Sequence, residues 1–558
     1  MTWRRLLSFA VVVSLLGACT SEPPPVPDLT APPDAVVWKA VDNVNQTPRD
    51  QLANGGHLRI GLTEWTADWN PWSAALPAQL AKILDAVRPR LFNVTGGGEL
   101  QPNPDWLDGV PTVENDPVTR VVYHLNPAAV WGDGRPVGVA DFQAAWHGCA
   151  DPAADRPCSA GQGFEAIVSI EEGETPHDIV VVYTGLYPDW ALTFLHGPVR
   201  ADPATGDPFA VWDNPAACRD SQAGPYTIVA MAPDGGNMTL VANPWWWGDA
   251  PLLDSVTAYR LAPGELTGSL RAGEYDAWPI GTDPAAYAAA SIADNLQLRR
   301  SPSPSWRVLL LDQNNSILSD RHVRQAIVDA LDRTALAGAD LPGLAWSPEA
   351  PDSLAWQPGQ ARYADLAAST GLPGDAAAAA TLLDEAGWTL EDGQRQKDGE
   401  KLSLVYGVAA DDPLSESAGL QLRVQLAAIG VEVILAPQDT VAAGPLSTQG
   451  LDLVTVTWAN GLSPAQRLQA AFSTGSPANQ TGYGNPTVDS LLATARQTAD
   501  LEAQDNLIAA ADATLWRDAV AFPLYSAPDT WAAVPNLANF GPSGLAELRW
   551  QDVGFANS

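Results

Sequence analysis

Apolar side chains recur along the chain at two spacings, one typical of strands and one typical of helices. After Gly55-Gly56, residues 58–62 alternate as in a strand, and residues 80–87 carry apolar side chains at helical spacing. From 323 to 331 apolar residues fall at i, i+3, i+4, i+7 and i+8, which is one face of a helix. Further strands are predicted at 121–125, 402–406, 431–435 and 451–458, and a further helix at 420–429. This alternation predicts an α/β fold with a mixed or parallel sheet.

The first apolar run has a different meaning. Residues 6–18 follow Arg4 and Arg5 and are too few to span a membrane, which takes about 20 residues. They fit the hydrophobic region of a signal peptide, so residues 1–18 are predicted to be one. The run ends Leu16-Gly17-Ala18-Cys19, which resembles the bacterial lipobox and implies lipid attachment at Cys19. The alternative is an ordinary signal peptide followed by a chance cysteine.

A proline-rich segment follows Cys19. Residues 20–34 contain six prolines, at 23, 24, 25, 27, 32 and 33, and such a segment favours an extended conformation that cannot form a core. Residues 19–35 are therefore predicted to be a tether. We expect the remainder of the chain to lie outside the cytoplasm, anchored to the cell membrane by the lipid alone.

Charge excludes one class of partner. The 65 acidic and 30 basic residues give a net charge of −35, and no basic stripe interrupts the acidic surplus, so nucleic-acid binding is not expected. The surplus fits a solvated surface better than a site for a cationic ligand. With 46% hydrophobic residues, the 558-residue chain can form a large core and has the length of three to four domains.

Cysteine and histidine predict no metal site. Beyond Cys19 the cysteines are Cys149, Cys158 and Cys218, and in an oxidising compartment two of them would pair. Three pairings are possible, and Cys149 with Cys158 would clip the loop after a helix. The chain has no CxxC motif and its histidines are scattered, so neither a metal nor another cofactor is expected.

Motifs of catalysis are also missing. The sequence contains no HExxH, GxSxG, SxxK or GxxxxGK[ST] motif. Because catalytic triads can be dispersed along a chain, this does not exclude a hydrolase, but the sequence predicts that the protein is not an enzyme.

Several short motifs, taken in order, carry a family resemblance. The first is the turn Trp131-Gly132-Asp133-Gly134-Arg135-Pro136, which follows a strand and is followed by Val139-Ala140-Asp141-Phe142. The others are AGPY at 223–226, NPWWWG at 243–248, AGEYD at 272–276, DRHVRQAI at 320–327 continuing to Asp332-Arg333, AGW at 386–388 and GYGNP at 482–486 with Asp489. In this order the motifs resemble those of the family 5 extracytoplasmic solute-binding proteins, which include oligopeptide, dipeptide and nickel receptors. The resemblance covers about residues 55 to 550.

The resemblance implies a two-lobe periplasmic-binding-protein fold of type II, cluster C-like, with an extra inserted subdomain. Lobe I would be assembled from residues 36–90, 223–304 and 530–558, the insertion from 91–222 and lobe II from 305–529. The chain would then cross between the lobes near 304 and 530, forming a hinge that closes over a ligand.

The same resemblance implies where the ligand binds. Trp65 and Trp69 follow the first predicted strand, Trp458 ends the strand at 451–458, and Asn479 and Tyr483 lie in the loop that follows. Each of these could equally serve plain packing.

One departure from the family concerns charge. Peptide-binding relatives carry an aspartate in the loop after this strand, which pairs with the α-ammonium group of the peptide. This chain has Asn460 near that position, and Glu64 is the nearest candidate for a substitute acid.

The sequence thus predicts a monomeric lipoprotein that captures a peptide or peptide-like solute for the permease subunits of an ABC-type importer. Three alternatives stay open: a receptor for another amphiphile such as a glycopeptide, siderophore or haem; an envelope binding or chaperone lipoprotein without a transporter; and a secreted hydrolase. The sequence does not identify the ligand.

Overall fold

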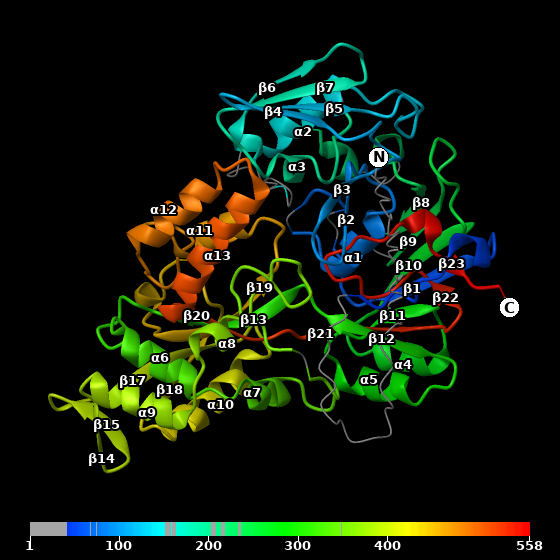
Figure 1. The fold of residues 1–558 in the computed structure, drawn as a ribbon. Coiled ribbons are helices and arrows are strands. Elements are labelled where there is room, and N and C mark those ends of the chain that lie inside the picture. Colours follow the sequence, from blue (N-terminus) through cyan, green and yellow to red (C-terminus); the bar gives the residue numbers. More distant parts are fainter. Residues whose placement is uncertain are drawn as a thin grey trace, which may run out of the picture. The chain divides into compact units, whose positions relative to one another are not determined.

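Strands from distant parts of the chain form the larger sheet, which we call sheet I (Figure 1). The computed structural model describes residues 42–66, 69–73, 75–150, 158, 163–201, 208–213, 218–232, 236–347, 349–442 and 444–557. The strand order of sheet I is β12 (Gln297–Pro302), β21 (Pro528–Ala533), β11 (Ala277–Pro279), β1 (His57–Leu62), β10 (Ser255–Arg260), β9 (Asn237–Ala242) and β8 (Tyr226–Ala232). Because β1 runs parallel to β10 and β11 while the other neighbours are antiparallel, the sheet is mixed.

Helices cover both faces of sheet I. Helix α1 (Ala78–Leu84) belongs to the same core as the inward residues of β1, whereas α4 (Leu266–Ala272) and α5 (Pro284–Ser291) belong to a second core. Successive residues of β21 alternate between these cores, with Trp531 and Ala533 in the first and Ala532 in the second. This is the two-residue period of a strand buried on both sides.

Sheet II is assembled from the middle of the chain. Its strand order is β18 (Glu432–Gln438), β17 (Ser403–Ala409), β19 (Leu453–Ala459), β13 (Ser305–Leu311) and β20 (Ala521–Tyr525). Residues of α6 (Arg321–Asp329), α7 (Arg333–Asp340), α8 (Leu366–Thr370), α9 (Ala376–Glu385) and α10 (Ser415–Ala427) share one core with it. Residues of α11 (Pro464–Phe472), α12 (Pro486–Ala495) and α13 (Leu501–Arg517) share the other. A small sheet of β14 (Thr389–Glu391), β15 (Gln394–Lys397) and β16 (Glu400–Lys401) follows α9.

Residues 91–222, which we call the insertion, share the core of sheet I. They contain the hairpin β2 (Phe92–Val94) and β3 (Leu100–Pro102) and a sheet ordered β4 (Thr112–Asn115), β5 (Thr119–His124), β7 (Asp178–Tyr183) and β6 (Ile167–Glu172). Their helices are α2 (Val139–Cys149) and α3 (Trp190–Thr193). Cys149 forms a disulfide with Cys158, and Cys218 is buried. Because one continuous cluster of buried side chains runs from β1 to β7, the insertion has no separate core.

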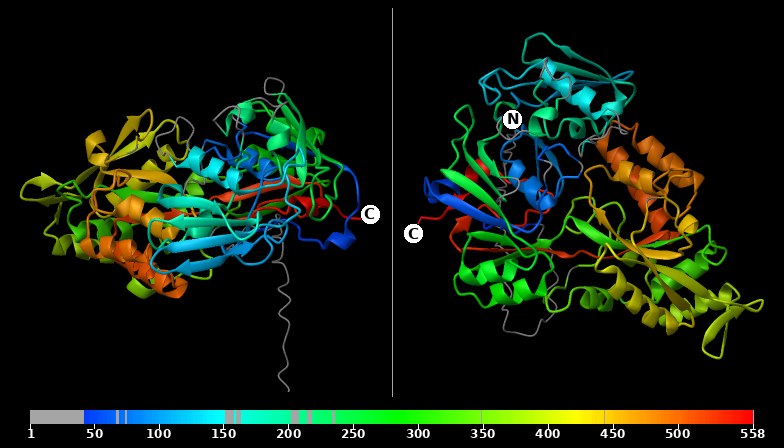
Figure 2. Two further views of the ribbon diagram at one scale, coloured as in Figure 1. Left: turned by 90° about the horizontal axis from the view of Figure 1, so that it is seen from above. Right: turned by 180° about the vertical axis from the view of Figure 1, so that it is seen from behind.

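The chain passes between sheets I and II at two adjacent points. β12 leads into β13 at 303–304, and β20 leads into β21 at 526–527, so β21 begins slightly before the expected boundary at 530. The backbone N–H of Ser303 donates to the carbonyl of Ala527 at 2.9 Å, which ties the two crossings together. In the right-hand view of Figure 2, the red segment carrying β20 and β21 runs from one sheet to the other.

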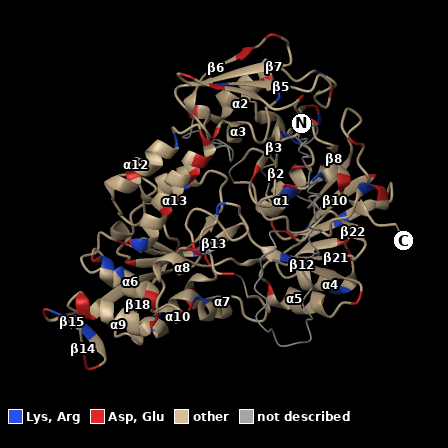
Figure 3. Cartoon of the chain, viewed as in Figure 1, with Lys and Arg blue, Asp and Glu red and all other residues tan. Residues whose placement is uncertain are grey.

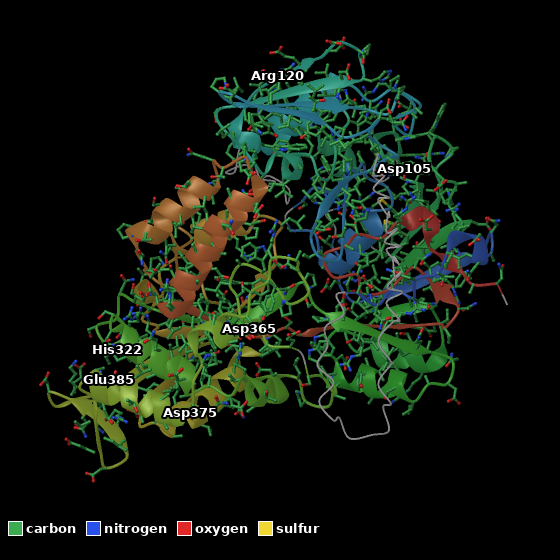
Figure 4. All side chains as sticks on the ribbon, in the orientation of Figure 1. Asp105, Arg120, His322, Asp365, Asp375 and Glu385 are labelled. Atoms are coloured by element: carbon green, nitrogen blue, oxygen red, sulfur yellow. A yellow bond between two sulfur atoms is a disulfide. The ribbon has the colours of Figure 1, made fainter. Side chains whose placement is uncertain are left out.

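Part of the acidic surplus serves local structure. Asp and Glu are distributed over the regions of sheet I, sheet II and the insertion in Figure 3. Six helices begin at an aspartate whose carboxylate accepts backbone N–H groups of the first turn: Asp283, Asp320, Asp332, Asp365, Asp375 and Asp500. Two of these caps, Asp365 and Asp375, are labelled in Figure 4. Aspartate is favoured at this position because it satisfies N–H groups that lack a partner within the helix.

The predicted α/β fold with a mixed sheet is confirmed, with small shifts at element ends. The helix expected at 420–429 begins earlier, at Ser415, and ends at Ala427. It ends there because Gly430 adopts a left-handed conformation, with φ of 84°, that turns the chain into β18. The predicted signal peptide, Cys19 and the tether lie outside the described residues.

Gly224, in the AGPY motif, packs closely against the backbone after α1, so the segments before and after the insertion lie side by side. Its N–H donates to the carbonyl of Val87 at 3.0 Å, and the N–H of Tyr226 donates to that of Ala86 at the same distance. A Cβ atom at Gly224 would lie 2.3 Å from the Ala86 carbonyl oxygen. Since the obstacle is backbone, it cannot move aside as a flexible side chain would.

We therefore expect Gly224→Ala to lower the free energy of unfolding by about 3 kcal/mol, at the upper end of the usual cost of overpacking. The matched control is Gly268→Ala within α4, where nothing lies within 4 Å of the added atom. That change should raise stability by about 0.5–1 kcal/mol through helix propensity. Urea unfolding of both variants tests the expectation, and equal midpoints would contradict it.

Candidate functional site

A cavity of about 490 Å³ lies between the insertion and the segments that surround sheet II. One wall comes from the hairpin β2–β3, the residues before β4, and α3. The other comes from residues 356–362, residues 461–465 and the first turns of α13. The volume falls within the roughly 300–1,000 Å³ of typical small-molecule sites. Because its walls come from the part that shares the core of sheet I and from the surroundings of sheet II, this cavity is the candidate site.

Aromatic and aliphatic side chains line much of the cavity. Phe92 and Trp190 meet edge to face with ring centroids 5.8 Å apart on the insertion wall, and Trp356 lies on the other wall. Val110 and Leu501, one on each wall, are 73% and 62% exposed. Each wall therefore presents accessible apolar surface to the cavity.

The charged side chains in the cavity are mostly acidic. Asp505 pairs with Arg362 at 2.7 Å, and its burial raises the pKa of the Asp505 carboxyl while Arg362 lowers it. Asp189 accepts hydrogen bonds from Ser463 Oγ and from Gln504 Nε2, the latter at 3.5 Å. Glu99 is exposed on the hairpin. The lining therefore contains three carboxylates and one guanidinium.

Arg467 stabilises one wall of the cavity through hydrogen bonds to its backbone. Its guanidinium donates to the carbonyl oxygens of Leu354 and Ala355 at 3.1 and 2.7 Å, and to that of Gly461 at 3.1 Å. It also lies over the ring of Trp306, 5.3 Å from the centroid. Burial lowers the pKa of Arg467 to about 10, so the group stays charged at neutral pH. One cation thus joins residues 354–355 to the loop after β19.

Asp512 holds the same segment from α13. It accepts hydrogen bonds from Ser353 Oγ at 2.5 Å and from the N–H of Leu354 at 2.9 Å, and it is 2% exposed. Burial raises the pKa of the Asp512 carboxyl to about 6, although these hydrogen bonds and Arg467 lower it. The backbone that precedes Trp356 is therefore anchored on both sides.

Asn460 belongs to this anchoring network. Its Nδ2 donates to the side-chain oxygens of Gln357 and Gln360 at 3.2 and 2.9 Å, and its Oδ1 accepts from Arg467 at 3.3 Å. The residue is 6% exposed. Its polar atoms are thus already hydrogen-bonded within the wall, which leaves little hydrogen-bonding capacity for a ligand.

Comparison with known proteins identifies the family. Residues 101–480 match the model described as bacterial extracellular solute-binding proteins, family 5 middle. The chain belongs to this family. The oligopeptide-binding protein OppA of Mycobacterium tuberculosis is 26% identical over 562 residues, which cover 99% of this chain and 93% of OppA. The probable monoacyl phosphatidylinositol tetramannoside-binding protein LpqW of the same organism is 25% identical over 487 residues, 77% of this chain and 70% of LpqW.

The fold of this family 5 solute-binding protein also matches solved structures. The periplasmic EDTA-binding protein EppA has a TM-score of 0.77 at 23% identity, covering 94% of this chain and 99% of EppA. The expected type II periplasmic-binding-protein fold is thereby confirmed. Members of the family are substrate-binding proteins, not enzymes.

Trp458 lies beside a second, smaller cavity in this family 5 protein. On β19 it pairs with Trp306 of β13 and packs against Phe472, with ring centroids 5.5 Å apart. It lines a space of about 310 Å³ together with residues of α11 and of the loop at 478–481. It does not line the larger cavity.

Asn479 and Tyr483 make local contacts in the loop after α11. Asn479 donates to the carbonyl oxygens of Ser473 and Tyr483 and accepts from Thr481. The Tyr483 hydroxyl donates to Asp518 at 2.8 Å. Both residues are about 5% exposed. Their described contacts fit a role in shaping this loop, and ligand contact stays a prediction.

The residues predicted after the first strand also lie apart from the larger cavity. Trp65 and Trp69 meet edge to face at 5.2 Å, and both indole N–H groups are buried without a described hydrogen-bond partner. Glu64 is exposed and accepts the N–H of Gln79 at 3.2 Å near the start of α1. A role of these residues in ligand binding stays a prediction.

None of the seven residues predicted to bind the ligand lines the 490 Å³ cavity. Phe92, Asp189 and Trp190 belong to the insertion, for which the sequence analysis named no binding residue. Trp356 and Arg362 lie in a segment without regular periodicity. One sequence feature could have indicated this wall of the cavity: Trp190 follows a proline and an aspartate in a loop after a strand of valines.

Two further features bear on function. In the part of the chain that the structure describes, no group of three or more His, Cys, Asp or Glu side chains could hold a metal ion. Within the same residues, no helix combines the length and apolar character that crossing a membrane requires.

The raised pKa of Asp512 predicts how stability changes with pH. The pKa of Asp512 is 3.8 in the unfolded chain and about 6 in the folded protein, so the folded protein keeps this proton up to a higher pH. Its contribution is therefore most favourable below pH 4 and is lost as the pH rises through 6, by about 3 kcal/mol at 1.36 kcal/mol per pKa unit.

Asp512→Asn should remove this dependence. Relative to Asp512→Asn, the wild-type protein should lose about 2.4 kcal/mol of unfolding free energy between pH 4 and pH 7, because only the wild type must bury the ionised carboxylate. Urea unfolding at both pH values measures this difference. Glu385→Gln, an exposed acid labelled in Figure 4, is the control and should follow the wild type. A constant difference between wild type and Asp512→Asn would contradict the expectation.

Proposed function

We propose that the chain captures a peptide or peptide-like solute in the 490 Å³ cavity and delivers it to the permease subunits of an ABC-type importer. The observation that carries this proposal is the construction of the cavity. Its walls come from the insertion, which shares the core of sheet I, and from the surroundings of sheet II, and the chain crosses between these two parts at 303–304 and 526–527. A site between bodies joined in this way can open to admit a solute and close around it.

Sequence similarity supports a peptide ligand. OppA, described as oligopeptide-binding, aligns with 99% of this chain. The apolar rings of Phe92, Trp190 and Trp356 suit apolar side chains of a peptide, and the carboxylates suit its polar groups. A peptide-binding receptor is therefore the first candidate.

An amphiphile other than a peptide is the second candidate. LpqW, described as a probable binder of a mannosylated lipid, aligns with 77% of this chain. The exposed Val110 and Leu501 offer apolar surface on opposite walls, as a ligand with an acyl or aromatic portion would need. A glycopeptide or similar amphiphile fits this surface as well.

A ligand retained by protein purified from its own host and identified by native mass spectrometry would separate these candidates. For the peptide candidate, the probe is an equimolar mixture of tetrapeptides built from Ala, Phe and Leu. Trp190→Ala and Trp356→Ala should each weaken binding about 10- to 100-fold, since burial of one large apolar side chain contributes roughly 1.5–3 kcal/mol.

Trp245→Ala is the matched control for these variants, because Trp245 is 48% exposed and lies outside the cavity lining. It should bind the mixture like the wild type. Equal losses in all three variants would reject the cavity as the site, and absence of any binding by the wild type would reject the peptide candidate.

We further propose that Cys19 carries the lipid and that the body is held outside the cytoplasm at the cell membrane. The Leu16-Gly17-Ala18-Cys19 sequence and the proline-rich segment after it support this proposal.

Cys19→Ser should release the protein from membranes and abolish labelling by a fatty-acid analogue, because lipid attachment requires the thiol. Cell fractionation and metabolic labelling measure both effects. Cys218→Ser serves as control and should stay membrane-bound and labelled. Continued labelling of Cys19→Ser would refute the proposal.

A further inference from the structure

A carboxylate in the cavity has no cationic partner among the described residues. Asp189, immediately before α3, is half-buried and lines the cavity. Its described partners are Ser463 Oγ and the distant Gln504 Nε2, both neutral. By contrast, Asp505 on the opposite wall is already paired with Arg362.

Asp189 also keeps unused hydrogen-bonding capacity. A carboxylate can accept about four hydrogen bonds, and the described contacts of Asp189 use two. A partly buried charge without a counter-charge is unfavourable, so a cation that entered the cavity would be stabilised there. The ring of Trp190, the next residue, lines the same space and can add a cation–π attraction.

The loop after β19 cannot supply a negative charge for a cation in the cavity. Asn460 is neutral and bonded to Gln357 and Gln360, and its carbonyl oxygen faces the Arg467 guanidinium. Even an aspartate at 460 would meet Arg467 first, because that cation lies 3.3 Å away. Glu64 lies outside the lining of the cavity.

We propose that Asp189 is the specificity-determining acid of the cavity and receives an ammonium group of the ligand. The shared chemistry is a primary ammonium, which a peptide can supply from its N-terminus or from a lysine side chain. This inference rests on the proposed function, since it assigns one residue of the same site.

The test is a competition read by native mass spectrometry on the full chain. Three equimolar tetrapeptide mixtures built from Ala, Phe and Leu are compared: one with free N-termini, one N-acetylated, and one N-acetylated but with lysine as the first residue. The wild type should bind the free mixture at least about tenfold better than the acetylated one, which corresponds to 1.4 kcal/mol. Better binding of the lysine mixture than of the plain acetylated one would assign the ammonium to a side chain as well.

Asp189→Asn should reduce the ratio of binding between the free and the acetylated mixtures to about one. Asparagine keeps the oxygen that accepts from Ser463 but loses the charge. Asp108→Asn, an exposed acid of the insertion, is the control and should keep the wild-type ratio. If Asp189→Asn does not fold, judged by circular dichroism, Asp189→Ser gives the same comparison.

Two outcomes would overturn the assignment while leaving the peptide function intact. One is equal binding of free and acetylated mixtures by the wild type. The other is a wild-type ratio that persists in Asp189→Asn, which would move the role to another acid such as Glu99, which also lines the cavity. If the wild type bound none of the mixtures, the peptide function itself would fail, and this assignment with it.

Discussion

The Arg467 guanidinium is the contact on which the candidate site most depends. It is half-buried, so its charge is met largely by oxygens of the protein, and the carbonyls of residues 354, 355 and 461 meet it. Those carbonyls belong to two segments that share no strand or helix. Because the cation cannot lose a partner without cost, both segments keep one relative position, and Trp356 and Leu462 are presented to the cavity from a fixed backbone.

This contact also explains why a neutral residue stands at position 460. An uncharged amide can accept from Arg467 and donate to two glutamines at once, which a carboxylate cannot do. The side chain therefore serves the wall of the site. The acidic character of the cavity then comes from other elements, the start of α3 and the first turns of α13.

The regular elements were predictable because their periodicity is local. Val323, Ala326 and Ile327 recur at helical spacing and are fully buried in α6, as the pattern required. The cavity was less accessible to such reasoning, since Trp356 and Asp189 lie in irregular segments that meet only through the tertiary fold. The partners of Asn460 illustrate the same limit: its position was readable from the sequence, but Gln357 and Arg467 are brought to it by long-range packing.

The paired crossings between sheets I and II have a mechanical consequence. Two strands bonded through Ser303 and Ala527 form a ribbon, which bends more easily across its thin direction than within its plane. Relative motion of the two sheets would therefore favour bending across this ribbon over sliding within its plane. Such guidance would bring the same side chains of the two walls together at each closure, so the recognition geometry would be reproduced without a search over orientations.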